Sequence, residues 1–197
     1  KTEAIPAVTS PNPIKNASIS ASNASGALAF SRLTDTNGRI PRQVVLDYWR
    51  NATVVSNQNN YTIMVSKSAY TSVSRSVNIT NNRFEAFIIN FGSCGILDEE
   101  NRVYSLPKSV NSSGTCFTIS ANNITIDGNG FSINHSKLNN GDGIFILRYN
   151  GTTIKNLIIR EESSVFSSDG VQVTLSYNTT IVNNTIIVNR DLSDGIS

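Results

Sequence analysis

The sequence has little charge, few cysteines and histidines, and no long apolar run. Its 16 basic and 14 acidic residues are 15% of 197 and leave a net charge of +2, against about 25% charged residues in an ordinary soluble domain. Without a basic run, nucleic-acid binding is disfavoured. One histidine and two cysteines are too few ligands for a zinc site. No apolar stretch approaches the roughly 18 residues that cross a bilayer as a helix.

Asparagine, serine and threonine are abundant where charge is scarce. The chain has 26 Asn, 44 Ser plus Thr and eleven Asn-x-Ser/Thr sequons, about twice the roughly six expected from random order. Composition alone accounts for about half of them, and the excess favours a protein secreted past an oligosaccharyltransferase. The predicted N-glycosylation sites are Asn16, Asn23, Asn51, Asn60, Asn78, Asn111, Asn123, Asn134, Asn150 and Asn178.

The two cysteines also favour an extracellular location. Cys94 and Cys116 enclose 21 residues, and a single even pair in a secreted protein most simply forms one disulfide. A reduced, buried pair is the alternative. The chain begins at Lys1 without an initiator methionine or apolar leader, as a mature or excised ectodomain would.

Residues 1–12 and 13–92 have different patterns. The first segment is predicted to be extended because of Pro6 and Pro11, and we hypothesise that it pairs with a sheet edge of a neighbouring subunit. Residues 13–92 are predicted to form a β-sandwich, because short alternating segments are broken by Asn, Gly and Ser at about 8- to 12-residue spacing. Asn37-Gly38 predicts a tight turn there.

Three segments of this half carry a family resemblance. Residues 34–41 contain a T-D-x-N-G turn, and residues 60–70 and 74–80 follow with a Y-x-I-x-V pattern. In these features the half resembles the carboxypeptidase regulatory-like, prealbumin-type Ig-like domains over roughly residues 13–91, although Ala69 stands where the family usually has glycine. The resemblance implies a spacer or binding module without catalytic residues.

Residues 93–197 contain a repeat. Ile126, Ile154 and Ile181 are separated by 28 and 27 residues, and a second column of Asp-Gly pairs begins at Asp142, Asp169 and Asp194. A period in the twenties, with short β-branched segments and Asn or Gly at each corner, is typical of a solenoid. Each coil is predicted to hold two or three strands, stacked in parallel on the coil before it. Residues 194–197 begin another coil, so the solenoid is expected to continue beyond the chain end.

The corners of the repeat make further predictions. Gly128, Asn156 and Asn183 fall two residues after the aligned isoleucines, and both residue types tolerate a left-handed backbone. A turn at Asn183 would make its sequon a doubtful glycosylation site. Three further sequons, at Asn123, Asn150 and Asn178, align in another column. Sugars on coils about 4.8 Å apart would crowd there, so some sites are empty or the coils are offset.

The second half also resembles known proteins. The segments 94–97, 104–106 and 112–130, together with the repeat, are similar to right-handed parallel β-helices with pectate-lyase-like and periplasmic copper-protein-like repeats. More narrowly, they resemble the first coil of large archaeal cell-surface proteins, in which Ig-like modules are joined to β-helices. The resemblance implies a multidomain surface protein.

The Asp column is the one candidate for catalysis. Asp169-Gly170 and Asp194-Gly195 look like the Asp-Gly element of polygalacturonase-type hydrolases, which need a protonated and an ionised carboxylate at the glycosidic bond. The family's paired aspartates, Gly-His-Gly and Arg-x-Lys elements are missing, and Asp-Gly at a recurring corner is more often a turn. We therefore predict no catalytic residues. We also predict no cofactor, although stacked carboxylates would suit Ca²⁺.

The whole sequence predicts an all-β, extracellular, non-catalytic N-glycoprotein. It is expected to be a structural component of a cell-surface layer, sheath or filament, associating with itself or with other surface subunits. One alternative is an adhesin that binds glycans through Tyr48, Trp49, Tyr61 and Tyr70. The other is a polysaccharide hydrolase or lyase that uses Asp142, Asp169 and Asp194.

Overall fold

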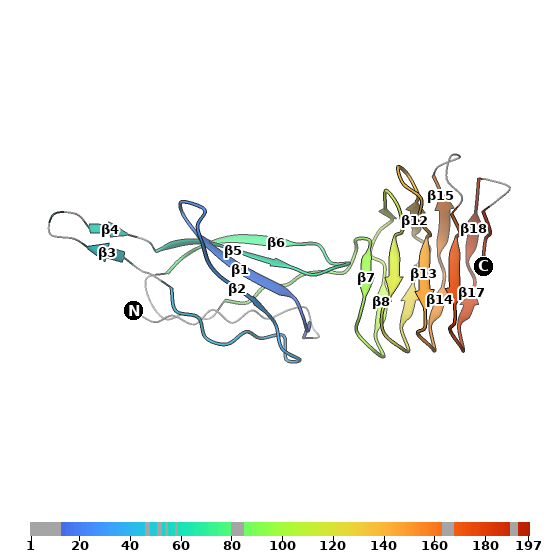
Figure 1. The fold of residues 1–197 in the computed structure, drawn as a ribbon, viewed down its shortest axis with the longest axis horizontal. Helices are drawn as coiled ribbons and strands as arrows, with labels where there is room; N and C mark the ends of the chain where they lie inside the picture. The colour runs from blue at the N-terminus through green and yellow to red at the C-terminus, as the bar shows by residue number, and fades with distance from the viewer. Residues whose placement is uncertain are drawn as a thin grey trace. The chain divides into compact units, whose positions relative to one another are not determined.

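The chain is all-β. A computed structural model describes residues 13–45, 48–50, 53, 55–57, 59–79, 85–162, 168–189 and 193–197, and these contain strands but no helix (Figure 1). Segment 1–12, predicted to be extended, and sequon Asn51 lie outside the described residues. The chain divides into two compact units. The N-terminal unit is drawn from Lys1–Lys67 and Thr71–Asn90, and the coil unit from Ser68–Tyr70 and Phe91–Ser197.

The N-terminal unit is built on an antiparallel sheet of order β2-β1-β5-β6. Alternation decides which face is buried: in β5, Tyr61, Ile63 and Val65 are buried while Thr62 and Met64 are exposed. A separate ribbon pairs β3 with β4. The strands are β1 (Ser18–Asn23), β2 (Leu28–Leu33), β3 (Tyr48–Arg50), β4 (Val55–Asn57), β5 (Asn60–Ser66) and β6 (Val73–Asn78).

The turn expected at Asn37-Gly38 is confirmed. The Asp35 carboxylate Oδ1 accepts the backbone N–H groups of Asn37 at 2.8 Å and Arg39 at 2.9 Å. Gly38 has a φ of 67°, a left-handed conformation that glycine adopts without a steric penalty. Local side-chain chemistry therefore sets this turn.

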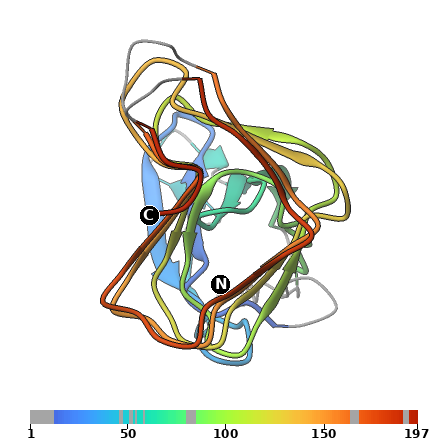
Figure 2. The same ribbon diagram turned by 90° about the vertical axis from the view of Figure 1, so that its right-hand side faces the viewer.

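The coil unit contains three parallel four-stranded sheets, and the chain visits them in rotation. Sheet 1 has the order β16-β13-β10-β7, sheet 2 β17-β14-β11-β8 and sheet 3 β18-β15-β12-β9. Viewed along the stack, successive turns of the chain follow one three-sided outline (Figure 2). The strands are, for sheet 1, β7 (Gly95–Leu97), β10 (Phe117–Ile119), β13 (Ile144–Leu147) and β16 (Val171–Thr174); for sheet 2, β8 (Val103–Ser105), β11 (Thr125–Asp127), β14 (Thr153–Lys155) and β17 (Thr180–Val182); for sheet 3, β9 (Val110–Asn111), β12 (Ser132–His135), β15 (Ile158–Glu161) and β18 (Thr185–Ile187).

The register matches the isoleucine spacing read from the sequence. Ile126 pairs with Ile154, and Ile154 pairs with Ile181. The first two are fully buried, and Ile181 on the edge strand β17 is partly exposed. Similar columns of aliphatic side chains point into the interior from the other two sheets. The column of sheet 1 is Leu97-Ile119-Ile146-Val173, and that of sheet 3 is Ile133-Ile159-Ile186. The core thus contains stacked columns of β-branched and leucine side chains, together with the buried rings of Tyr104 and Phe117.

The corner predicted at Gly128, Asn156 and Asn183 has a left-handed φ at the aligned residue in two of three coils. Asn156 and Asn183 have φ angles of 56° and 53°. Gly128 also begins a turn, since its carbonyl accepts the Phe131 N–H at 2.8 Å, but its own φ is not left-handed. Ile133 follows Ile126 by seven positions, whereas Ile159 follows Ile154 by five. The longer corner turns instead at Asn129 and Gly130, with φ angles of 50° and 81°.

The sequon column is offset by one residue in its middle coil. The left-handed residues that stack in register at this corner are Asn101, Asn123, Gly151 and Asn178. Asn150 precedes Gly151 and stacks in the neighbouring column instead. There its backbone N–H donates to Asn122 Oδ1 at 2.9 Å, and its own Oδ1 accepts Tyr177 N–H at 2.8 Å. A coil offset, which is one of the two alternatives for relieving crowding, is therefore present at Asn150.

Candidate functional site

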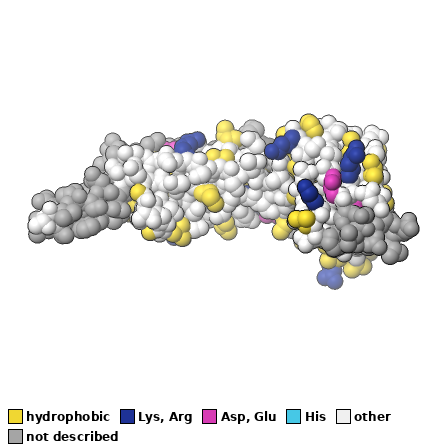
Figure 3. All heavy atoms as spheres, turned by 90° about the horizontal axis from the view of Figure 1, so that it is seen from above, with side chains coloured by type: hydrophobic (Ala, Val, Ile, Leu, Met, Phe, Trp, Pro, Cys, Tyr) yellow, Lys and Arg dark blue, Asp and Glu magenta, His cyan; other side chains and the backbone are white. Residues whose placement is uncertain are grey.

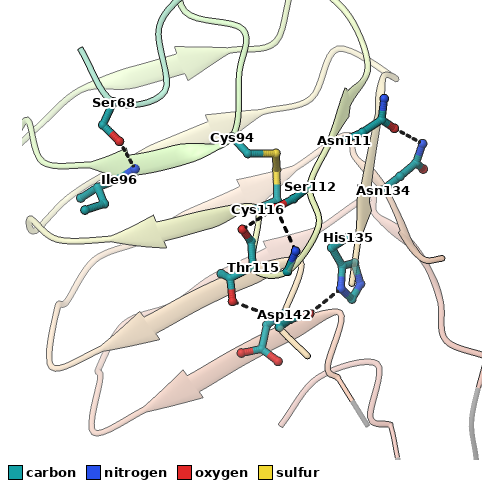
Figure 4. The surroundings of a disulfide bond; sticks show 12 residues. Ser68, Cys94, Ile96, Asn111, Ser112, Thr115, Cys116, Asn134, His135 and Asp142 are labelled. Carbon is teal, nitrogen blue, oxygen red and sulfur yellow. Dashed lines mark hydrogen bonds between the residues drawn. A yellow bond between two sulfur atoms is a disulfide. The ribbon is translucent and has the colours of Figure 1, made fainter. Parts of the chain in front are cut away.

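The Asp column forms a hydrogen-bonded ladder across three coils. Asp142 Oδ1 accepts the backbone N–H of Asp169 at 3.0 Å, and Asp169 Oδ1 accepts that of Asp194 at 2.9 Å. In the preceding coil Thr115 Oγ1 has the same role, because it accepts the Asp142 N–H at 3.1 Å (Figure 4). Each side-chain oxygen thus satisfies an amide of the next coil, which is a structural use of the carboxylate.

A polar pocket lies over this ladder. Its volume is about 410 Å³, and it is lined by Asn140, Gly141, Asp142, Ser168, Asp169, Gln172 and Asp194. Burial raises the pKa of the Asp142 carboxyl, and the neighbouring Asp169 charge adds to the rise. The Asp169 N–H and nearby His135 oppose it. The pocket therefore contains the three candidate carboxylates, one of which favours its protonated form more than a solvent-exposed Asp does.

A buried polar network borders the pocket, and sequence reasoning missed it. Ser168 Oγ donates to Asn140 Oδ1 at 2.6 Å, accepts Gly141 N–H at 3.1 Å and lies 2.9 Å from Ser136 Oγ. Further along, Ser193 Oγ lies 3.1 Å from Ser168 N and donates to Glu161 Oε1 at 3.3 Å. At this place in the coil unit, serine hydroxyls rather than aliphatic side chains connect one coil to the next.

Two ionisable side chains lie inside this corner. His135 pairs in register with Glu161, and both are buried. His135 Nδ1 lies 2.9 Å from Gly141 O, and Glu161 Oε2 accepts Asn189 N–H at 2.8 Å. The residues flanking His135 in sequence, Asn134 and Ser136, give no sign of its burial. Within the described residues, no group of three His, Cys, Asp or Glu side chains is placed to hold a metal ion.

The disulfide joins the first two coils. Cys94 and Cys116, the chain's two cysteines, are bonded with their Cα atoms 4.6 Å apart. They precede the register pair Gly95 and Phe117 of sheet 1 and fasten β7 to β10 (Figure 4). The pairing agrees with the one expected from the sequence.

Removing the disulfide is expected to destabilise the coil unit. The double variant Cys94→Ser/Cys116→Ser should lose about 3 kcal/mol of unfolding free energy, because the crosslink closes a loop of about 20 residues in the unfolded chain. Urea unfolding of the variant and of the oxidised parent measures the difference. Reduced parent protein should match the variant, and an unfolding midpoint that reduction leaves unchanged would contradict the expectation.

Residues Ser68–Tyr70 cover the start of the coil unit. Ser68 Oγ accepts the Ile96 N–H at 2.7 Å (Figure 4). A Cβ on Gly95 would lie 2.4 Å from Ala69 N, so glycine is required for this approach. Ala69 itself has a φ of 66°, the left-handed conformation that glycine adopts more easily. Tyr70 packs edge-on against Phe91, with ring centroids 6.0 Å apart.

Asp127 differs from the Asp column because it has a cationic partner. Its Oδ1 accepts Asn156 Nδ2–H at 3.0 Å and Asn129 N–H at 3.1 Å, while Lys155 Nζ lies 3.1 Å from Oδ2. These bonds, with Asn156 the main cause, lower the pKa of the Asp127 carboxyl. Lys155 therefore bridges two coils.

The lowered pKa predicts a pH-dependent effect of Asp127→Asn. A carboxyl whose folded-state pKa is depressed stabilises the protein above the unfolded pKa of about 3.9 and loses that contribution as pH falls through the folded value. The variant should be less stable near neutral pH, by at most about 1 kcal/mol. It should equal the parent at about pH 2. Urea unfolding at both pH values measures this.

Asp142→Asn is the matched control, because the Asp142 pKa shift has the opposite sign. An equal stability loss in both variants near neutral pH would show that charge is not the cause. A loss for Asp127→Asn that persists unchanged in acid would lead to the same conclusion.

The proposed sugar-stacking patch is not assembled as predicted. Tyr61 and Tyr70 are 3% and 5% exposed, so neither can stack on a ligand at the surface. The side chains of Tyr48 and Trp49 lie outside what the structure describes. Tyr61 and Tyr70 are packing residues, as aromatic side chains in sheets usually are.

The sequon asparagines are accessible. Of the ten that the structure describes, eight are exposed, Asn23 and Asn134 are half-buried, and none is buried. Asn23 is also a turn residue, because its Oδ1 accepts Ala27 N–H at 2.9 Å. On the face shown in Figure 3, basic side chains are scattered rather than clustered.

Comparisons with known proteins identify no relative: no protein-family model matches the chain, and no curated protein matches it. Among the described residues, no helix is long and apolar enough to span a membrane.

Proposed function

We propose that this chain is part of an extracellular, N-glycosylated structural protein of a cell-surface layer, sheath or filament. In this proposal the N-terminal unit is an Ig-like sandwich of the carboxypeptidase regulatory-like type, and the coil unit is a right-handed parallel β-helix. The observation that carries the proposal is the placement of the sequons. Of the ten described sequon asparagines, eight are exposed and none is buried, whereas the repeat buries its aliphatic columns.

The remaining support comes from the construction of the coil unit. Its columns join one coil to the next through the disulfide, the Asp ladder and asparagine amides. Through these contacts, side chains hold each coil to the next along the stack. A disulfide is also a feature of proteins that leave the reducing cytosol. A rigid spacer that associates with other surface subunits would use both properties.

Expression in a secreting, N-glycosylating host tests the proposal. The secreted chain should shift to lower mass when an amidase removes N-linked sugars, and a variant with all eleven sequon Ser/Thr residues replaced by Ala or Val should not. A secreted chain whose mass the amidase leaves unchanged would refute the glycoprotein assignment. Sedimentation of the glycosylated chain over a concentration series then measures self-association.

A polysaccharide hydrolase is the second candidate, and the polar pocket favours it. Asp142 and Asp169 are register neighbours, and their strands are about 4.8 Å apart, near the roughly 5–5.5 Å between the carboxyls of retaining glycosidases. Against it, each has an oxygen held by the next coil's amide. Release of reducing sugar from acidic polysaccharides, abolished in Asp169→Asn, would establish the enzyme, because asparagine keeps the Oδ1 acceptor of the ladder.

A further inference from the structure

We propose that four of the sequon asparagines work as two pairs, and that each pair carries at most one oligosaccharide in the folded protein. The pairs are Asn60 with Asn78 and Asn111 with Asn134, and the members of each are direct register partners on neighbouring strands. The inference rests on the proposed glycosylation and refines it, because it states which combinations of sites are compatible with the fold.

The first pair lies on the antiparallel strands β5 and β6. Partners that face each other across an antiparallel pair project from the same face of the sheet, and Asn60 and Asn78 are both exposed. The adjacent pair is hydrogen-bonded, since Ile79 N–H donates to Asn59 O at 2.6 Å. Bonded and non-bonded pairs alternate, so Asn60 and Asn78 form the closer, non-bonded type with Cα atoms about 4.5 Å apart.

That separation is too small for two N-linked sugars. Each oligosaccharide begins with a hexose ring attached to Nδ2, and the ring with its hydroxyls is wider than the spacing between the two asparagines. Both rings would have to leave the sheet in the same direction. One sugar on either asparagine therefore blocks the second.

The second pair lies on the parallel strands β9 and β12, about 4.8 Å apart. Here the amides already bind each other, because Asn134 Nδ2–H donates to Asn111 Oδ1 at 2.7 Å (Figure 4). Asn134 is half-buried, and its strand lies between β9 and β15, with Arg160 as its partner on the other side. Asn111 is exposed on the outer strand of sheet 3. The sugar of this pair therefore belongs on Asn111.

Peptide mass spectrometry of the folded, secreted chain tests the pairing. Cleavage at acidic residues leaves Asn60 and Asn78 on one peptide, residues 48–85, and trypsin leaves Asn111 and Asn134 on residues 109–137. An amidase applied after cleavage converts each formerly glycosylated Asn to Asp. We expect peptides converted at Asn60 or at Asn78 and none converted at both. In the second peptide we expect conversion at Asn111 and none at Asn134.

Thr62→Val provides the competition test, because it removes the Asn60 sequon at an exposed strand position. Asn78 occupancy should rise to the sum of the two parental occupancies. Thr185→Val is the matched control, because it removes the Asn183 sequon by the same substitution. Asn156, the register partner of Asn183, has no sequon, so this variant should leave the glycan occupancy of Asn78 unchanged. Folded molecules with sugars on both Asn60 and Asn78, or on both Asn111 and Asn134, would refute the pairing and leave the proposed glycosylation standing. A chain without sugar at any sequon would refute the proposed glycosylation and the pairing together.

Discussion

Replacing Ile154 by alanine is expected to lower the free energy of unfolding by about 3 kcal/mol. Ile154 is fully buried on β14, stacked between Ile126 and Ile181 in the interior of the coil unit. Truncation removes three buried carbon atoms and leaves a cavity that strands fixed on both sides by hydrogen bonds cannot close. Urea unfolding followed by circular dichroism measures the loss.

Ile181→Ala is the matched control for this column. Ile181 has the same residue type and register position but is partly exposed on the edge strand β17. Its truncation should cost clearly less, because the solvent already reaches the side chain. Equal losses at the two positions would contradict the view that the column forms a closed interior at Ile154.

The coils could be predicted from the sequence because their determinants are local and repeated. β-Branched residues at Ile126, Ile154 and Ile181 set the register, and asparagine with a left-handed φ sets the corners. The corner at Gly128 could not be predicted by alignment. Two extra residues before Ile133 move the turn to Asn129, and the period between aligned isoleucines changes too little to show it.

The candidate site was only partly predictable. The spacing of the Asp-Gly pairs placed Asp142, Asp169 and Asp194 together, but it did not show that their oxygens accept the next coil's amides. Burial of His135 and Glu161 could not be read either, since single charged residues are normally placed outside. Glu161 follows His135 by 26 positions in sequence, and only the stacking of the coils brings the two into register inside the unit.

Residues Ser68–Tyr70 show the same limit. They precede Ile96 by more than 20 residues, and no pattern in the sequence links the two segments. Their contact with the first coil depends on Gly95, whose missing Cβ lets the Ala69 backbone approach. A repeat in the sequence predicts the features that successive coils share. The segment that covers the first coil is not repeated, so the repeat does not predict it.

The glycines of the Asp-Gly column predict the second large effect, which is a loss of stability in Gly143→Ala. A Cβ at Gly143 would lie 2.4 Å from Gly170 O and 2.5 Å from Ile159 Cγ2. Gly170 O accepts the Ile144 N–H at 3.0 Å, so the added methyl pushes against a backbone group that holds two coils together. Overpacking of this kind costs about 1–3 kcal/mol, and the upper end is expected because the obstacle is backbone.

Gly195→Ala separates this crowding from the general effect of replacing glycine. Gly195 occupies the same column on a later coil, but a Cβ there would meet only Ile186 Cγ2 at 3.7 Å, an ordinary contact. This variant should have a stability within about 0.5 kcal/mol of the parent, as substitutions without a steric or packing cost usually do. Thermal and urea unfolding of the two variants measure the difference. If Gly143→Ala were as stable as Gly195→Ala, the coils at the Asp ladder would be farther apart than the hydrogen-bond distances require, and the continuous stack that supports a structural role would be interrupted there.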